Sequence, residues 1–210
     1  HHLGFIKVNM PESCIIKNLT WNNLDGYLET LTPRSKKHFK KEIQPFEKYF
    51  DVEYKDNASC GEIEIFHNLF ENVRARNLDL NTFSFPKELF SNISEDSNWE
   101  FLVLYLKKEY DIRSERLPVA VMFCYKNMNH TYVPSFIGMD YDYTQKYQIY
   151  RQMLFQTIKR AKELNFKKID FGMTASFEKK KVGAMIIPKV AYIQAHDNYN
   201  MELMGMMQKK

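Results

Sequence analysis

The feature that most constrains the fold is a change of hydrophobic period near the middle of the chain. Three successive segments, at residues 99–107, 117–126 and 131–139, carry the short period typical of β-strands. Polar turns separate them, which predicts an antiparallel meander. The period then lengthens to that of a helix over residues 144–164, and a short strand is expected at residues 168–171. Because a long helix between two strands implies a crossover, we expect a mixed sheet.

The residues before the meander predict helices that could cover such a sheet. We expect a short helix that is capped by Thr20 and ended by Pro33, and a second helix from Ser35 to Tyr49 with a kink at Pro45. The remaining expected elements are an extended segment at 3–19 broken by Pro11, a strand at 51–55, an amphipathic helix at 62–76, a short helix opened by Pro86 and a last strand at 187–196.

Length and composition fit one globular domain. Of the 210 residues, 44% are hydrophobic and 27% are charged, which is typical of a folded chain with a substantial core. We expect a single domain over residues 3–198 and a methionine-rich tail over residues 199–210. His1 and His2 resemble the remnant of an expression tag. The chain does not start with Met, so we expect it to be part of a longer protein.

Several classes of protein are disfavoured. The cysteines at positions 14, 60 and 124 lie too far apart for a disulfide framework or a zinc knuckle, and HExxH is absent, so we expect no metal. The cysteine pattern favours a reducing compartment, and hence a cytoplasmic location. No apolar run approaches the ~20 residues of a membrane span, so no stable membrane insertion is expected. The net charge of +4 permits an anionic ligand without indicating a nucleic-acid protein.

The most informative loop is the segment DFGMTASFEKKKVGA at residues 170–184. It places Gly172, Thr174 and Gly183 beside a run of lysines that begins with Lys179. Exposed backbone N–H groups next to cationic side chains can hold a phosphate or a carboxylate. A solvated basic loop would explain the same residues. The spacing matches neither a P-loop nor a dinucleotide fingerprint.

Two other features have both a functional and a structural interpretation. Asp140 and Asp142 precede the long helix, where Asp140 could orient a cationic substrate or act as a base; capping of the helix explains both residues equally well. The predicted helix at 35–49 carries Lys36, Lys37, Lys40 and Lys41. These lysines could meet a phosphate-rich ligand, or they could form an ordinary solvated face.

The motifs resemble those of the FemAB-like branch of the GNAT-type N-acyltransferase superfamily, in its C-terminal GNAT-like half. The matching stretches are the segment that begins PESCIIKNLTW, the strand end FIGMDYDY, the helix YQIYRQMLFQTIKRAKELNF and the closing TASFEKKKVGAMIIPKVAY. They cover the chain from about residue 11 to residue 193. The residues that carry the pattern are Gly138, Asp140, Tyr141, Tyr150, Phe171, Gly172, Thr174, Ala175, Lys179, Gly183, Ala184 and Pro188.

The resemblance implies an α/β fold with a GNAT-like mixed, twisted sheet flanked by helices on both faces. It implies a bacterial enzyme that transfers an acyl or aminoacyl group from acyl-CoA or aminoacyl-tRNA to an amine acceptor, which could be a peptidoglycan precursor. Relatives of this branch contain two tandem GNAT-like halves, so an N-terminal half is expected to be missing here. Typical GNAT enzymes hold pyrophosphate on a Q/R-x-x-G-x-G/A loop, whereas this chain has MDYDYTQKY at that place.

The resemblance also assigns candidate roles to individual residues. Asp140 is the candidate for orienting or deprotonating the amine, and Tyr150 for donating a proton or simply packing. The candidates for binding the donor or another anionic group are Gly172, Thr174, Lys179 and Gly183. A different class of function stays open: a catalytically silent GNAT-like module that binds a cell-envelope glycan, a peptide or a partner protein.

Overall fold

The computed structural model describes residues 5–76, 84–128 and 130–194. Its centre is a seven-stranded sheet in the order β2-β3-β4-β5-β6-β1-β7, in which only β5 and β6 run parallel. The strands are β1 (Ile6–Lys17), β2 (Phe50–Lys55), β3 (Trp99–Leu106), β4 (Pro118–Asn127), β5 (Thr131–Met139), β6 (Lys168–Asp170) and β7 (Met185–Ile193). The mixed sheet and the antiparallel β3-β4-β5 meander confirm the predicted fold class.

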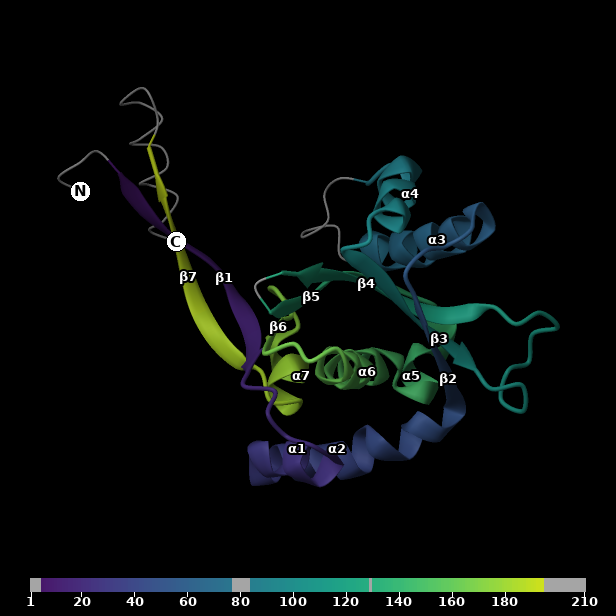
Figure 1. Ribbon diagram of the computed structural model, residues 1–210, viewed down its shortest axis with the longest axis horizontal. Coiled ribbons are helices and arrows are strands. Elements are labelled where there is room, and N and C mark those ends of the chain that lie inside the picture. Colours follow the sequence, from purple (N-terminus) through teal and green to yellow (C-terminus); the bar gives the residue numbers. More distant parts are fainter. Residues whose placement is uncertain (1–4, 77–83, 129, 195–210) are drawn as a thin grey trace.

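Helices cover both faces of the sheet (Figure 1). One face is covered by α3 (Cys60–Arg76) and α4 (Lys87–Glu95). The other face is covered by α5 (Tyr141–Tyr147), α6 (Ile149–Glu163) and α7 (Ser176–Lys181). A further layer lies outside α6, formed by α1 (Leu24–Thr30), α2 (Pro33–Glu42) and the 3-10 helix η1 (Gln44–Tyr49).

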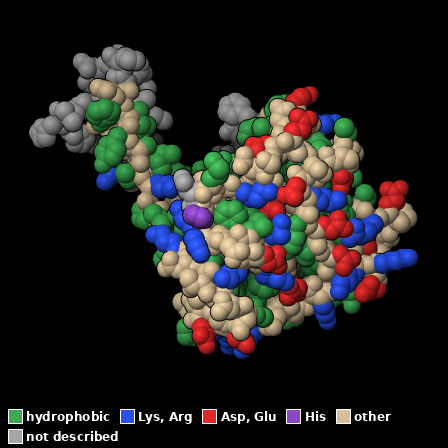
Figure 2. Space-filling model, in the orientation of Figure 1, with side chains coloured by type: hydrophobic (Ala, Val, Ile, Leu, Met, Phe, Trp, Pro, Cys, Tyr) green, Lys and Arg blue, Asp and Glu red, His purple; other side chains and the backbone are tan. Residues whose placement is uncertain are grey.

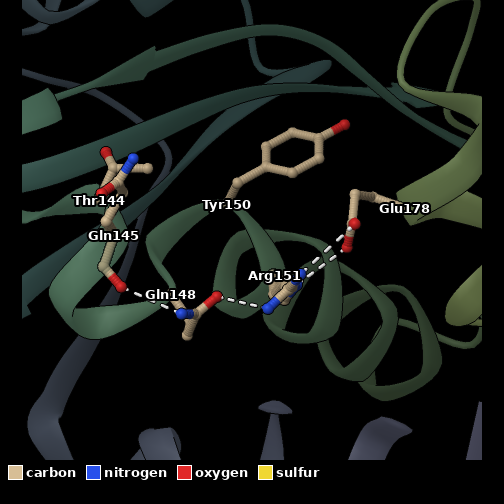
Figure 3. Close-up of a pocket in the computed structure, with 6 residues that line it drawn as sticks. All are labelled: Thr144, Gln145, Gln148, Tyr150, Arg151 and Glu178. Carbon is tan, nitrogen blue, oxygen red and sulfur yellow. Dashed lines mark hydrogen bonds and ion pairs between the residues drawn. The ribbon is translucent and has the colours of Figure 1, made fainter.

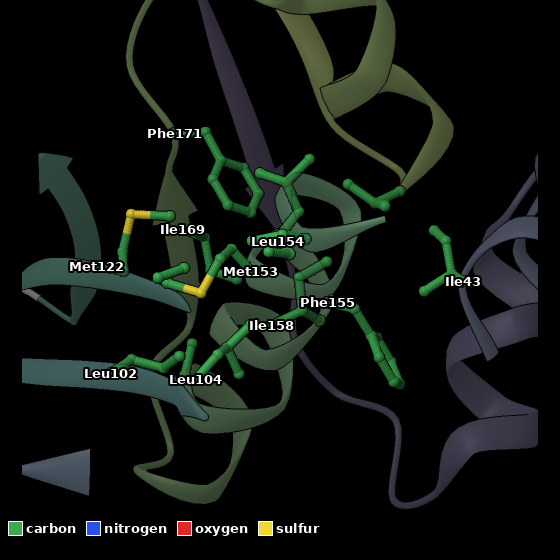
Figure 4. Packing of buried hydrophobic residues seen from close by; sticks show 14 of the residues in the cluster. Ile43, Leu102, Leu104, Met122, Met153, Leu154, Phe155, Ile158, Ile169 and Phe171 are labelled. Carbon is green, nitrogen blue, oxygen red and sulfur yellow. The ribbon is translucent and has the colours of Figure 1, made fainter. Parts of the chain in front are cut away.

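Each face of the sheet has its own hydrophobic core. On the α6 side, Met153, Leu154 and Ile158 belong to the core beneath the strands (Figure 4), and Phe155 packs against Phe39 of α2. On the α3 side the core is rich in aromatic rings, and Phe66 and Phe123 are fully buried there. Alternate residues of β3 and β4 therefore contribute to different cores, which explains why these two buried strands read as nearly continuous apolar runs.

Strands β5 and β6 meet at one end only. Their register pairs Thr131 with Lys168 and Tyr132 with Ile169, after which β6 ends and β5 continues to Met139. Among the described residues, no strand pairs with that side of β5 beyond Tyr132. The two strands thus enclose a split that opens toward the start of α5 (Tyr141–Tyr147).

A buried ionic network fixes the closed end of this split. Glu100 of β3 is only 1% exposed, and it accepts hydrogen bonds from the Tyr132 hydroxyl at 2.6 Å and from Arg160 Nη2 of α6 at 2.8 Å. A buried carboxylate is costly unless its oxygens are satisfied, and here both are. The network joins β3, β5 and α6 where β5 last pairs with β6.

The other end of the sheet extends into a two-stranded arm. Figure 1 shows β1 and β7 running together away from the body, with Ile6 opposite Ile193 and Met10 opposite Lys189. The expectation that Pro11 breaks this extended segment is wrong, because β1 continues through it with a shift of register between Met10 and Ser13. Figure 2 shows hydrophobic side chains along the arm, whereas charges of both signs are interspersed over the body.

The first helices begin and end at other residues than predicted. Asn23, not Thr20, caps α1, because its side chain accepts from the Gly26 N–H while the Thr20 hydroxyl turns back to Asn18. Pro33 does not merely end a helix; it opens α2 behind the Thr32 cap, as proline can in a first turn. The break before η1 falls at Ile43 rather than at Pro45.

The long helix expected over 144–164 is two helices. Asp140 starts α5 earlier, and Gln148 takes a left-handed conformation at φ 54° that separates α5 from α6. The loop expected at 170–184 contains the short helix α7. The last strand begins at Met185, and the methionine-rich tail lies outside the described residues.

Substitution of Gly138 tests the packing of α3 on β5. A Cβ at this position would lie 2.7 Å from backbone atoms of both Leu69 and Phe70, so Gly138→Ala forces the helix away from the strand. We expect a loss of about 1–3 kcal/mol in the free energy of unfolding, measured by urea denaturation. Gly61→Ala is the control, since its Cβ would meet nothing within 4 Å. A Gly138→Ala protein as stable as the parent would contradict this packing.

Candidate functional site

An open pocket lies at the junction of α5 and α6, beside α7 (Figure 3). Its volume is about 570 Å³. The lining residues come from three helices and the break between two of them, and they are Thr144, Gln145, Gln148, Tyr150, Arg151 and Glu178. α5 continues directly from the end of β5, so the helix that carries Thr144 and Gln145 starts where the split between β5 and β6 opens.

The break at Gln148 builds one wall of the pocket. The Gln148 amide donates to the Gln145 carbonyl oxygen at 3.0 Å and accepts from Arg151 Nη1 at 2.5 Å. These two bonds hold a non-glycine residue in the left-handed region, a conformation that usually costs free energy. The turn directs the side chains of Tyr150 and Arg151 toward α7 (Figure 3).

Arg151 joins three helices electrostatically. Its Nε lies 2.9 Å from Glu178 Oε2 of α7, and its Nη1 lies 3.3 Å from Glu42 Oε2 of α2. Lys181 also contacts Glu178, at 2.8 Å. Burial opposes ionisation of Glu178, but the hydrogen bonds from Arg151 and Lys181 outweigh it and hold the Glu178 pKa below its ordinary value. Glu178 is therefore a paired anion that positions helices, and its oxygens are already engaged.

Tyr150 is the pocket residue best suited to give a proton. It is half-buried, and burial raises the pKa of its phenol well above the ordinary value, with the nearby Cys14 and Glu178 adding to the shift. The phenol consequently stays protonated at neutral pH. It can donate a hydrogen bond to a developing oxyanion or a proton to a leaving group, and it accepts a proton only after it has given up its own.

Asp140 lies away from Tyr150, at the other end of α5. The seven residues of α5 separate them by about 10 Å along the helix axis. Asp140 Oδ1 accepts from the Asp142 N–H at 3.0 Å, and Oδ2 lies 4.0 Å from Arg113 Nη1. This is the capping geometry that the sequence left open as an alternative, and the structure does not bring Asp140 into the pocket.

The candidates in the 170–184 segment are only partly brought together. Lys179 is 5% exposed, and its Nζ donates to the carbonyl oxygens of Phe171 and Met173, each at 2.7 Å. Burial lowers the Lys179 pKa. Its ammonium thus holds the loop that contains Gly172 and Thr174, both at positive φ. Gly183 lies beyond the other end of α7, at φ 94°.

The sequence missed the residues that form most of the pocket. The helix breaks at Gln148, where the sequence has neither a glycine nor a proline that would predict a break. Arg151 and Glu178 are 27 positions apart, so no local sequence pattern predicts their ion pair.

Within the residues described, no group of three His, Cys, Asp or Glu side chains could hold a metal ion. No helix in the same described segments has the length and apolar character to cross a membrane.

Comparison with known proteins identifies the family. The family model for the acetyltransferase (GNAT) domain matches residues 33–180, which is well over half of the chain. The chain therefore belongs to the GNAT acetyltransferase-domain family, and its fold is the FemAB-like variant. A search of curated proteins found no match.

Solved structures share the fold at low sequence identity. FemX superposes with a TM-score of 0.67 at 12% identity, covering 99% of this chain and 69% of its own. L-PGS from Bacillus licheniformis gives 0.62 at 13% identity, covering 100% and 69%. The C-terminal domain of a putative lysylphosphatidylglycerol synthetase from Agrobacterium fabrum gives 0.58 at 12% identity, covering 99% and 66%. At such identities the likeness is one of fold.

The ion pairs of Glu178 predict how the free energy of unfolding depends on pH. A carboxyl whose pKa is lowered on folding contributes stability above its unfolded pKa of about 4.5, and this contribution is lost as the pH falls through the folded value. Glu178→Gln is expected to cost about 1–2 kcal/mol of unfolding free energy at pH 7 and progressively less below pH ~4.5. Urea denaturation at several pH values measures this. Glu29→Gln, at an exposed position on α1, is the control. A pH-independent loss at Glu178 would contradict the assignment.

Proposed function

We propose that the protein is an N-acyltransferase that passes an aminoacyl group from aminoacyl-tRNA to an amine acceptor, in the synthesis of a cell-envelope component. The observation that carries the proposal is the split between β5 and β6, together with the Tyr150 pocket on the helices that follow β5. The GNAT domain and the likeness to FemX and to a lysylphosphatidylglycerol synthetase support transfer of acyl or aminoacyl groups as the general reaction.

The unpaired side of β5 suits an extended donor. From Val133 to Met139 the strand pairs with β4 on one side, and no described strand pairs with its other side. Backbone N–H and C=O groups at a strand edge without a partner strand can bind an extended acyl or aminoacyl arm as a further strand would. A backbone N–H at this edge can also stabilise the oxyanion that forms on the acyl carbon.

The reaction needs little covalent participation by the protein. A neutral amine attacks the ester carbonyl of the donor, a C–N bond forms, and the C–O bond to the ribose breaks. The proton lost by the amine is ultimately balanced by the one that the leaving oxygen gains. In our proposal Tyr150 supplies that proton and recovers one from the amine through water, while the site holds the two substrates in line.

The start of α5 favours an RNA donor over acyl-CoA. Where GNAT enzymes typically present glycine-rich backbone to a pyrophosphate, this chain has Asp140 and Asp142, and the Asp140 carboxylate already accepts the Asp142 N–H. Two carboxylates at this place repel an anion and occupy a backbone donor. A tRNA-borne aminoacyl ester needs no pyrophosphate site.

One observation favours the second candidate, a silent binding module. Among the described residues that line the pocket, the only carboxylate is Glu178, which is paired with Arg151 and Lys181, and Asp140 caps a helix outside it. A site without a free base would suit a domain that binds an envelope glycan or peptide and does no chemistry. Transfer activity decides between the two candidates.

Substitution of Tyr150 tests the chemical role. Tyr150→Phe removes the proton donor and keeps the ring, so we expect transfer of a radiolabelled aminoacyl group from tRNA to fall about 10²–10⁴-fold. The acceptors are a lysine-containing peptidoglycan precursor and a panel of primary amines. Tyr192→Phe, on the exposed arm, is the matched control. Full activity in Tyr150→Phe would contradict this role, and absence of transfer in the parent protein would favour the binding module.

A further inference from the structure

The excess positive charge of the chain is concentrated on one helix. The chain has 30 basic and 26 acidic residues, a surplus of four. Within its ten residues α2 holds five of the basic side chains and one of the acidic ones. The rest of the chain is therefore electrically balanced, and α2 alone accounts for the surplus.

Four of these side chains form a continuous cationic surface, which we name the α2 lysine face: Lys36, Lys37, Lys40 and Lys41. They surround an open hollow of about 600 Å³, and no other residue that the structure describes lines it. Within the described structure one ion pair involves them, between Lys41 and Glu42 at 3.5 Å. Like charges three and four positions apart on a helix repel one another, so an anion at this surface would relieve that repulsion.

The inner side of α2 rules out the simplest membrane geometry. Phe39 and Ile43 are fully buried against α6, and the Gln152 side chain donates to the Ile43 carbonyl oxygen at 2.5 Å. An amphipathic helix that lies in a lipid interface inserts its apolar side. In α2 that side is already occupied by the protein core, so only the charged side is available to a ligand.

The α2 lysine face is also longer than the contact surface of a single phosphate group. Five residues separate Lys36 from Lys41, which is about 7.5 Å along the helix axis. Four ammonium groups over this length match a chain of phosphates better than one isolated anion, because each neutralised phosphate releases counterions from a polyanion.

We infer that the α2 lysine face is a docking surface for the phosphate backbone of a nucleic acid. The inference rests on the proposed function, since an aminoacyl-tRNA donor would bring such a backbone to the protein. The opposite side of α2 contributes Glu42 to the Arg151 cluster and places His38 Nε2 4.0 Å from Glu178 Oε2. RNA held on the outer side would therefore lie about one helix diameter, ~10 Å, from the pocket.

The test measures binding of a fluorescein-labelled RNA stem-loop by anisotropy between 50 and 200 mM salt. Four phosphate contacts predict a log–log slope of about −3.6, a loss of affinity of about 100-fold over this range. Replacement of the whole α2 lysine face by Gln is expected to make the slope shallower by about 3–4. The control replaces four exposed lysines on other segments by Gln, at Lys17, Lys108, Lys167 and Lys189.

Three outcomes would overturn the inference. An unchanged slope in the α2 variant would do so, as would an equal change in the control variant, which would indicate an effect of net charge alone. Vesicles of phosphatidylglycerol and phosphatidylcholine form the third arm. Loss of vesicle binding in the α2 variant with RNA binding intact would assign the face to a membrane instead.

Further measurements separate this inference from the proposed function. RNA binding is measured without any transfer reaction, so a protein that binds RNA through α2 but transfers nothing would keep the docking surface and reject the enzyme. A thermal melt of each variant verifies its fold. Substitution of exposed lysines is expected to leave the melting temperature unchanged or higher, because repulsion is removed.

Discussion

The structure depends on a buried carboxylate that fixes one end of a split sheet. Glu100 takes hydrogen bonds from Tyr132 and Arg160, and so ties β3, β5 and α6 together at the last residue where β5 pairs with β6. The cost of burying this charge is offset because both of its oxygens are satisfied. With that end held, β5 and β6 diverge toward α5. The unpaired edge of β5 is therefore a consequence of the fold, and no local unfolding is required to expose it.

At the junction of α5 and α6, electrostatics and backbone strain act together. Gln148 holds a left-handed turn that separates α5 from α6, and Arg151 ties the second helix to α7 and α2. Carboxylates occupy the start of α5, while the excess positive charge lies farther out on α2. This distribution disfavours an anion at the usual pyrophosphate position and favours one on α2, about a helix diameter from the Tyr150 pocket. It is the physical basis for preferring a donor whose phosphates lie far from its reacting ester.

The sequence predicted the layers better than the pocket. The meander and the crossover follow from hydrophobic periods, because buried faces must repeat with the geometry of the element. The break at Gln148 could not be predicted, since it depends on side-chain bonds rather than on glycine or proline. Lys179 was expected in a basic loop, but it lies in the unpredicted helix α7, where its Nζ donates to two carbonyl oxygens. Capping by Asp140 was one of two readings of the sequence, and local geometry decided between them.

The measurement that tests the account most directly is hydrogen–deuterium exchange with two donor analogues. One is an RNA oligonucleotide that carries its amino acid in a stable 3′-amide linkage, and the other is acetyl-CoA. The account predicts that the aminoacyl-RNA slows exchange in residues 133–139 and at the junction of α5 and α6, and that acetyl-CoA changes neither. Protection of these segments by acetyl-CoA alone, or protection by the RNA that spares the edge of β5, would contradict it.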